Sequence, residues 1–192
     1  MAIPTKKPAT YEDLRALPDH LIGELIAGEL IASPRPSIPH ARAASVLGED
    51  LGGPFDRGRG GPGGWWFLFE PEIHLGADVL VPDMAAWRRE RLPNLPDAPF
   101  MPIAPDWLCE VLSPGTRALD RVKKLHIYAR ERVAHVWLID PAERTLEIFR
   151  LQQTHFILSD TFAGDASVRA EPFDQVPLQL GALWVTPTFS SP

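Results

Sequence analysis

Three side chains in this sequence have the types and spacing needed to hold a hard metal ion and act on a phosphate. Asp83 follows an apolar stretch and a proline, Glu110 lies inside the apolar run of residues 107–112, and Lys124 comes one predicted helix later. A carboxylate is costly to bury unless it is paired or binds a metal ion. A lysine beside two such acids can neutralise charge that develops on a phosphate. The pattern therefore indicates hydrolysis of a phosphodiester bond.

The two acids favour Mg²⁺ as the metal ion, with Mn²⁺ as the alternative. Mg²⁺ binds proteins through one or two carboxylates while water completes its octahedron, and Mn²⁺ accepts the same oxygen ligands. The main-chain carbonyl of Val111, next to Glu110, would supply a third oxygen. Each acid also has a simpler explanation, because Glu110 would fit a solvent-facing edge strand and Asp83 would fit a turn.

The helix predicted over residues 117–130 decides where Lys124 points. At 3.6 residues per turn, Lys124 shares one side of this helix with Arg117, Arg121 and Tyr128, and Asp120 borders that side. The core is expected to contact a separate apolar stripe of Ala118, Val122, Leu125, Ala129 and Val133. Lys124 is therefore expected to point away from the core, either into solvent or toward Glu110, with Asp120 or Tyr128 holding it in place.

Two further residues are candidates to assist the reaction. His40 lies at a predicted helix start, and its ordinary pKa suits proton transfer at neutral pH. A helix-terminal histidine is more often structural, which is the alternative for His40. Glu24 is embedded in an apolar strand, so its burial raises the same question as that of Glu110.

The elements that must position these residues predict an α/β (α+β) fold. A β-hairpin is expected at residues 21–31, a helix at 40–51, and strands at 65–75, 80–87, 107–112, 134–139, 146–150, 156–158 and 179–185. Pro82 interrupts one of these strands, which predicts a bulge or an edge position there. The strand–helix–strand step from residue 107 to 139 predicts a parallel pair. We expect one domain over residues 1–192, with a mixed central sheet flanked by helices and an N-terminal hairpin.

Composition restricts the partners and the compartment. The net charge of −6 argues against a protein that coats nucleic acid non-specifically. A local basic rim could still form from Arg88, Arg89, Arg91, Arg117 and Arg121, although a solvated charge run fits these residues equally well. Cys109 is the single cysteine and lies in an apolar segment, which predicts a buried, inert thiol.

The sequence predicts a cytoplasmic protein without membrane contact. The segment MAIPTKKPAT lacks an apolar stretch, so no signal peptide is expected, and no apolar run approaches the length of a membrane span. Exposed strand edges are compatible with a homodimer.

Several motifs together resemble a known family. They are the stretch of residues 23–30, Ser33-Pro34 followed by His40, Val81-Pro82-Asp83, and residues 105–116 continuing through Asp120, Lys124 and Tyr128 to residues 136–141. In this series the chain is similar to the Uma-two family of the PD-(D/E)XK nuclease superfamily, which has the restriction-endonuclease-like fold. The resemblance implies that Asp83 and Glu110 are the metal-binding acids and that Lys124 is the catalytic lysine.

One position departs from the superfamily pattern. The E-x-K motif would place a lysine at position 112, where this chain has Leu112. The resemblance implies that the lysine has moved to Lys124 on the following helix. We therefore expect a Mg²⁺-dependent endonuclease that acts on DNA. RNA or another phosphodiester is an alternative substrate, and a non-catalytic nucleic-acid- or protein-binding module with the same fold is the alternative function.

Overall fold

The computed structural model describes residues 7–185. Residues 1–6, which hold most of the segment where no signal peptide is expected, and residues 186–192 lie outside the described part. Within residues 7–185, no helix is long and apolar enough to cross a membrane. That residues 1–192 form one domain stays a prediction.

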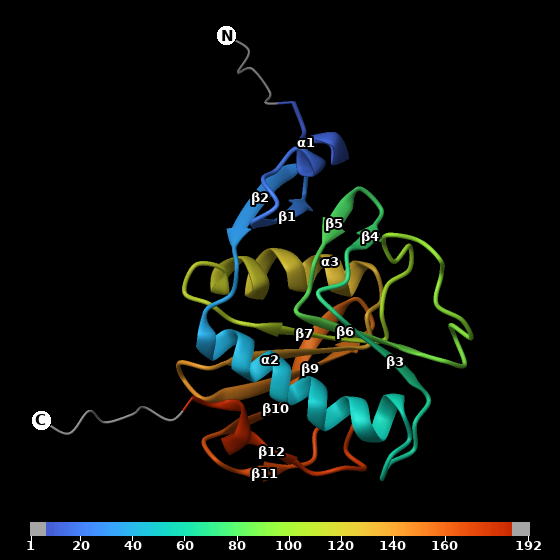
Figure 1. Cartoon of the computed structure of the whole chain (residues 1–192), viewed down its shortest axis with the longest axis vertical. Helices are drawn as coiled ribbons and strands as arrows, with labels where there is room; N and C mark the ends of the chain where they lie inside the picture. Colours follow the sequence, from blue (N-terminus) through green and yellow to red (C-terminus); the bar gives the residue numbers. More distant parts are fainter. Residues whose placement is uncertain (1–6, 186–192) are drawn as a thin grey trace, which may run out of the picture.

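A mixed sheet with six strands forms the centre of the molecule (Figure 1). Its strand order is β10-β9-β8-β7-β6-β3. The strands are β3 (Trp65–Phe69), β6 (Met84–Arg88), β7 (Trp107–Val111), β8 (His135–Asp140), β9 (Thr145–Gln152) and β10 (His155–Ala163). β7 and β8 are parallel and the other neighbours are antiparallel. The predicted parallel pair and the restriction-endonuclease-like mixed sheet are thus confirmed.

A smaller sheet carries the N-terminal hairpin. Its strand order is β2-β1-β5-β4, and its strands are β1 (Leu21–Ile26), β2 (Glu29–Pro34), β4 (Ile73–Leu75) and β5 (Asp78–Leu80). The hairpin turn uses Ala27 and Gly28, whose φ angles are 53° and 79°. Two positive φ angles match the twist of a two-residue hairpin. The predicted hairpin is confirmed, and a short helix, α1 (Tyr11–Arg15), precedes it.

Two predicted strands are wrong in one respect, because each is split between the two sheets. Residues 65–75 form β3 in the large sheet and β4 in the small one, with the break at Glu70, whose φ is 44°, and Pro71. Residues 80–87 end β5 at Leu80 and begin β6 at Met84. Pro82 has no N–H for a ladder, so the chain can leave one sheet there. Asp83 consequently lies at the crossing between the sheets.

The last predicted strand is also wrong. Residues 179–185 hold only the end of β12 (Leu178–Gln179), which pairs with β11 (Ser167–Val168), and then the 3-10 helix η3 (Leu180–Leu183). Leu180 and Leu183 are fully buried. A 3-10 turn brings residues three apart onto the same side, so both leucines can reach the core.

Helices cover both faces of the large sheet. On one face lies α2 (Ile38–Leu51), which continues into the π-helix η1 (Gly52–Asp56). On the other face lies the helical segment made of the π-helix η2 (Leu119–Lys124) and α3 (Leu125–Arg130), and the small sheet packs beside it (Figure 1). Helices are therefore present in both regions where the sequence predicts them.

The side chains of β7 point alternately to the two faces of the sheet, and Glu110 points to the face covered by α3. Trp107, Cys109 and Val111 belong to the core on the α2 face, whereas Leu108 and Leu112 belong to the core on the α3 face. Side chains of a strand point to opposite faces in turn. Glu110, between Val111 and Cys109, therefore projects toward α3.

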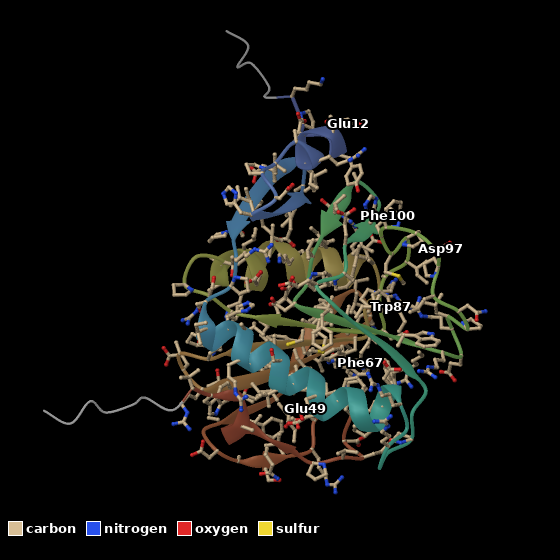
Figure 2. The ribbon with its side chains drawn as sticks, viewed as in Figure 1. Glu12, Glu49, Phe67, Trp87, Asp97 and Phe100 are labelled. Carbon is tan, nitrogen blue, oxygen red and sulfur yellow. The ribbon has the colours of Figure 1, made fainter. Side chains whose placement is uncertain are left out.

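Most of the buried side chains are hydrophobic. Trp87 is fully buried among packed side chains, while Glu12 and Asp97 are exposed (Figure 2). Cys109 is also fully buried, and burial raises the pKa of its thiol well above the ordinary value. An inert cysteine is what the sequence predicts.

Candidate active site

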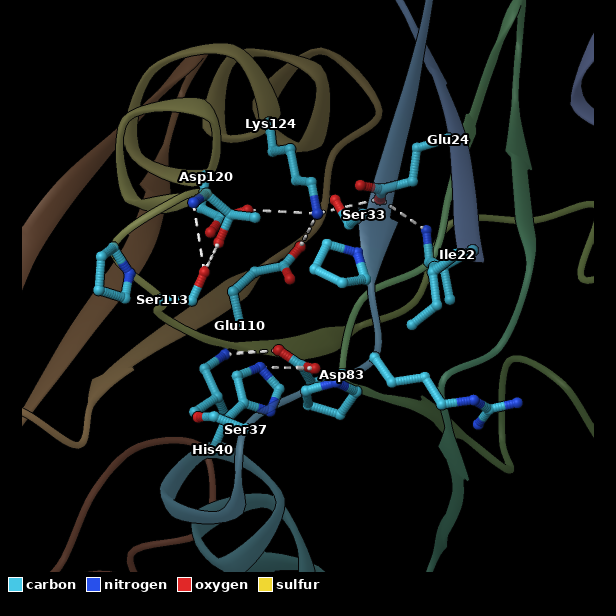
Figure 3. A pocket seen from close by; sticks show the side chains of 17 residues that line it. Ile22, Glu24, Ser33, Ser37, His40, Asp83, Glu110, Ser113, Asp120 and Lys124 are labelled. Atoms are coloured by element: carbon cyan, nitrogen blue, oxygen red, sulfur yellow. Dashed lines mark hydrogen bonds and ion pairs between the residues drawn. The ribbon is translucent and has the colours of Figure 1, made fainter. Parts of the chain in front are cut away.

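A pocket opens where the two sheets and both helical layers meet (Figure 3). Its cavity volume is about 250 Å³. All six residues singled out in the sequence line it: Glu24, His40, Asp83, Glu110, Val111 and Lys124. β1 supplies Glu24, α2 supplies His40, the crossing between the sheets supplies Asp83, β7 supplies Glu110 and Val111, and η2 supplies Lys124.

Lys124 lies inside a cluster of three carboxylates. Its Nζ is 2.9 Å from Glu24 Oε1, 3.3 Å from Glu110 Oε1 and 3.2 Å from Asp120 Oδ1. The contact with Asp120 is an ion pair without hydrogen-bond geometry, since Asp120 Oδ1 has no hydrogen-bond partner among the described residues. Lys124 is the one buried basic side chain in residues 7–185. A single ammonium therefore joins acids from β1, β7 and η2.

Lys124 points toward Glu110, one of its two predicted directions, but it is buried and the apolar stripe predicted for this helix is wrong in part. Lys124 and Asp120 are buried, whereas Val122 of the expected apolar stripe is 58% exposed. Two causes act together. The segment from Leu119 to Lys124 is a π-helix, so a wheel with 3.6 residues per turn misplaces its side chains. The acids below the helix also attract the lysine, and this ion pairing outweighs the hydrophobic pattern.

Glu110 is held by two donors on the same oxygen. Tyr128 donates its hydroxyl to Glu110 Oε1 at 2.6 Å, and Lys124 Nζ approaches the same atom. Glu110 Oε2 has no hydrogen bond from a described residue. Burial raises the pKa of Glu110 well above its ordinary value; the charge of Lys124 opposes this shift, and the acids Asp120, Asp83 and Glu24 add to it. An additional cation would therefore favour the ionised form of Glu110.

The pKa of the lysine shifts in the direction that keeps it charged. Burial by itself lowers the pKa of Lys124, but the charges of Glu110, Glu24 and Asp120 outweigh burial and raise that pKa well above its ordinary value. The ammonium is thus a permanent positive charge in the pocket wall.

Asp83 is fixed by contacts from two other elements. The backbone N–H of Val111 donates to its Oδ2 at 2.7 Å, and His40 Nε2 lies 3.2 Å from its Oδ1. The side chains of Asp83 and His40 are 16% and 13% exposed, so both remain reachable from the pocket. The pKa of His40 rises above its ordinary value, because burial, which lowers it, is outweighed by the hydrogen bond and charge of Asp83.

The donor set of the pocket fits an oxygen-binding cation. Within residues 7–185, no group of three or more His, Cys, Asp or Glu side chains is arranged to hold a metal ion by itself. Mg²⁺ requires fewer protein ligands, since one or two carboxylates together with water molecules are sufficient. Each carboxylate oxygen of Asp83 accepts one contact and keeps a lone pair, and Glu110 Oε2 is free to bind. Val111 also lines the pocket, as expected for a third oxygen ligand.

The charges in the pocket also favour a bound cation. Four carboxylates line the pocket, those of Glu24, Asp83, Glu110 and Asp120, and Lys124 is the single buried cation facing them. Ionised acids at this density repel one another. A divalent cation would relieve that repulsion.

The sequence analysis did not predict that Asp120 and Tyr128 are buried. Both are buried: Asp120 lines the pocket beside Lys124, and Tyr128 contacts Glu110 from behind the pocket wall. Their spacing was the available signal, because residues at i, i+4 and i+8 fall on one side of a helix.

None of the five arginines considered for a basic rim lines the pocket. Arg89 pairs with Asp56, Arg91 with Asp106, Arg117 with Asp140, and Arg121 with Glu147. Arg88 lies over the ring of Trp65. Four of the five arginines are thus paired with acids of the same chain.

Comparisons with known proteins agree with this fold. A solved structure described as a putative nuclease belonging to DUF820 from Anabaena variabilis ATCC 29413 superposes with a TM-score of 0.74 at 26% sequence identity, covering 92% of this chain and 97% of that chain. No curated protein matches the sequence. A sequence model of the Uma2 family, described as a putative restriction endonuclease, matches residues 8–181. Because that match spans most of the sequence, the chain belongs to the Uma2 family of restriction-endonuclease-like proteins.

Proposed function

We propose that the protein is a divalent-metal-dependent endonuclease that hydrolyses phosphodiester bonds in DNA. The observation that carries the proposal is the convergence of Asp83, Glu110 and Lys124 on one pocket with an excess of carboxylates. Family membership and the DUF820 neighbour support nuclease activity. The metal, the substrate, the cytoplasmic location and a homodimer remain predictions.

Asp83, Glu110 and the Val111 carbonyl would hold the metal ion, with Mg²⁺ favoured and Mn²⁺ as the alternative. When bound, such an ion lowers the pKa of its water and stabilises charge on the phosphate. The chain contributes fixed geometry. The Val111 N–H orients Asp83 and the Tyr128 hydroxyl orients Glu110, so neither carboxylate must reorganise when substrate binds.

Lys124 is proposed as the group that stabilises the developing negative charge. Its ammonium lines the pocket 3.3 Å from Glu110, which places it beside any phosphate held through that acid. Glu24 and Asp120 keep it there from opposite elements. This arrangement supplies the positive charge that the missing lysine at Leu112 would otherwise supply.

His40 is proposed to assist by proton transfer. Its Nε2 touches Asp83, and its pKa, raised by that carboxylate, keeps it able to exchange a proton near neutral pH. Its Nδ1 is buried without a hydrogen-bond partner among the described residues, so Nε2 is the nitrogen available for this task.

Plasmid cleavage tests the proposal. In Asp83→Asn, the amide oxygen still accepts the Val111 N–H while the charge is lost, so the fold is retained and Mg²⁺-dependent nicking falls at least about 100-fold. Asp160→Asn, an exposed acid on β10, is the matched control and keeps full activity. Cleavage by Asp83→Asn at the wild-type rate would reject the assignment.

The rival is a non-catalytic nucleic-acid- or protein-binding module, favoured by the self-paired arginines and by Leu112. Isothermal titration with Mg²⁺ and Mn²⁺ separates the two. An endonuclease binds one of these ions and loses the binding in Asp83→Asn, whereas the rival shows no binding above background.

A further inference from the structure

A second cavity lies on the other side of the His40–Asp83 pair. Its volume is about 160 Å³. Phe69 and Glu70 from the end of β3 form one wall, and Ala41, Ala44 and Ser45 of α2 form the other. Pro36, His40 and Asp83 belong to both cavities, so the two are adjacent across the proposed reaction centre.

Phe69 is an unusual wall for such a cavity because this large hydrophobic residue is 55% exposed. It is the one aromatic residue among the large hydrophobic side chains that are exposed in residues 7–185. A Cβ atom at Gly48 would lie 2.1 Å from Phe69 Cζ. The ring is therefore seated on the helix backbone where no side chain intervenes, and its remaining surface borders the cavity.

The backbone places Phe69 next to Asp83. In the antiparallel pair of β3 and β6, Phe69 lies opposite Met84, the residue that follows Asp83. Glu70 then adopts its positive φ of 44° and donates its N–H to the Asp83 carbonyl at 3.1 Å. A left-handed conformation at a non-glycine residue is unfavourable and is retained where surrounding contacts enforce it. The exposed ring and the metal-binding acid are thus held as neighbours.

We propose that this second cavity binds one unstacked nucleobase, and that the protein consequently binds single-stranded DNA, including unpaired stretches of a supercoiled plasmid, in preference to a continuous duplex. The inference rests on the proposed function, since it assumes that a DNA phosphate binds at Asp83. Recognition of single strands relies on aromatic side chains that stack splayed bases and on polar groups that bind their edges. Phe69 supplies the stacking surface, and the exposed Ser45 hydroxyl and Glu70 carboxylate supply hydrogen-bonding groups.

Surface charge favours the single strand over a continuous duplex. A duplex is bound largely through phosphate contacts to lysine and arginine. Here the net charge is −6 and four of the arginines near the strand ends pair with acids of the chain. Stacking needs no such basic track, and a base inside a duplex cannot reach a ring in a cavity.

Fluorescence of 2-aminopurine tests the proposal. The probe is a single-stranded oligodeoxynucleotide in which 2-aminopurine replaces each adenine in turn, titrated with protein in EDTA and again with Ca²⁺. We expect quenching at one position and affinity about 5- to 150-fold weaker for Phe69→Ala. Phe69→Trp should retain the affinity, and Leu158→Ala, which removes a side chain of similar exposure on β10, should leave it unchanged.

The outcomes separate this inference from the proposed function. Unchanged affinity in Phe69→Ala, absence of quenching at every position, or equal affinity for the duplex would overturn the base site, even where plasmid cleavage persists. Quenching that depends on Phe69 in a protein that cleaves nothing would uphold the base site while rejecting the nuclease.

Discussion

The two halves of the pocket differ in how far they are closed to solvent. In the closed half, Lys124, Glu24, Glu110 and Asp120 have side chains that are only 3–6% exposed. In the open half, Asp83 and His40 are 16% and 13% exposed and border the second cavity. Both halves contain carboxylates, but in the closed half one lysine pairs with three of them, whereas in the open half a single carboxylate contacts a histidine.

This difference assigns separate tasks to the halves. Lys124 forms ion pairs with one acid each on β1, β7 and η2, so the closed half connects the small sheet to the large one. One backbone N–H and one histidine hold the open half, which leaves oxygen lone pairs for a ligand. Substitutions in the closed half should therefore change stability as well as activity, whereas those in the open half should change activity alone.

Lys124→Met is expected to produce the largest effect. It removes the sole buried cation of residues 7–185 and leaves three buried carboxylates without their counter-charge, and breaking a buried ion pair in this way costs about 3–5 kcal/mol. Urea denaturation followed by circular dichroism measures the loss. Cleavage assayed below the new unfolding midpoint should also be lost.

Lys123→Met is the matched control for that substitution. Lys123 is the adjacent lysine, but its side chain is 46% exposed and pairs with Glu29 at the surface. Surface substitutions of this kind usually change stability by less than about 0.5 kcal/mol. Equal stability losses in the two variants would contradict the closed half as described.

Tyr128→Phe is expected to have an intermediate effect. The substitution removes the hydroxyl that donates to Glu110 Oε1 and leaves a buried acceptor with one donor fewer, at a cost of about 1–3 kcal/mol. Cleavage should fall as well, because Glu110 loses the group that orients it. Thermal and urea unfolding measure the first effect and plasmid nicking the second.

The other tyrosine provides the control for Tyr128→Phe. Tyr11 donates to Glu72 Oε1 at the same distance of 2.6 Å, but in a partly exposed position outside the pocket. Water can replace that donor, so Tyr11→Phe should cost about 1 kcal/mol or less and leave nicking unchanged. A larger stability loss in Tyr11→Phe would mean that burial does not distinguish the two hydroxyls.

The sequence was sufficient to predict the large sheet and the pocket residues. Apolar runs predicted most strands, Ala27-Gly28 predicted the hairpin, and burial cost singled out Glu110 and Glu24. The motif series predicted the family. These features are local, or depend on residue types that are expensive to bury, so they are visible without coordinates.

What could not be predicted depends on interactions between distant segments. The split of two strands between sheets follows from a backbone bend at Glu70 and from Pro82, and apolar residues stand on both sides of each break. The burial of Lys124 follows from acids on β1 and β7 that a helical wheel does not include. The pairing of Arg117 with Asp140 and of Arg121 with Glu147 likewise joins residues far apart in the chain.

A histidine outside the pocket gives the smallest predicted effect and a reference for His40. His135, at the start of β8, has its pKa lowered by burial; Arg88 and Arg150 act in the same direction, and Glu171, 3.7 Å away, opposes them. Because the folded state has the lower pKa, the unfolded chain binds more protons as the pH falls past the ordinary value of about 6.5, and the folded state loses stability there.

His135→Gln should therefore reduce the acid-induced fall in the free energy of unfolding, and Glu171→Gln should enlarge it. Urea titrations in EDTA at about pH 7.5 and about pH 5.5, which bracket that ordinary pKa, measure how the free energy of unfolding of each variant changes with pH. A wild-type pH dependence in His135→Gln would contradict the lowering of the His135 pKa by burial.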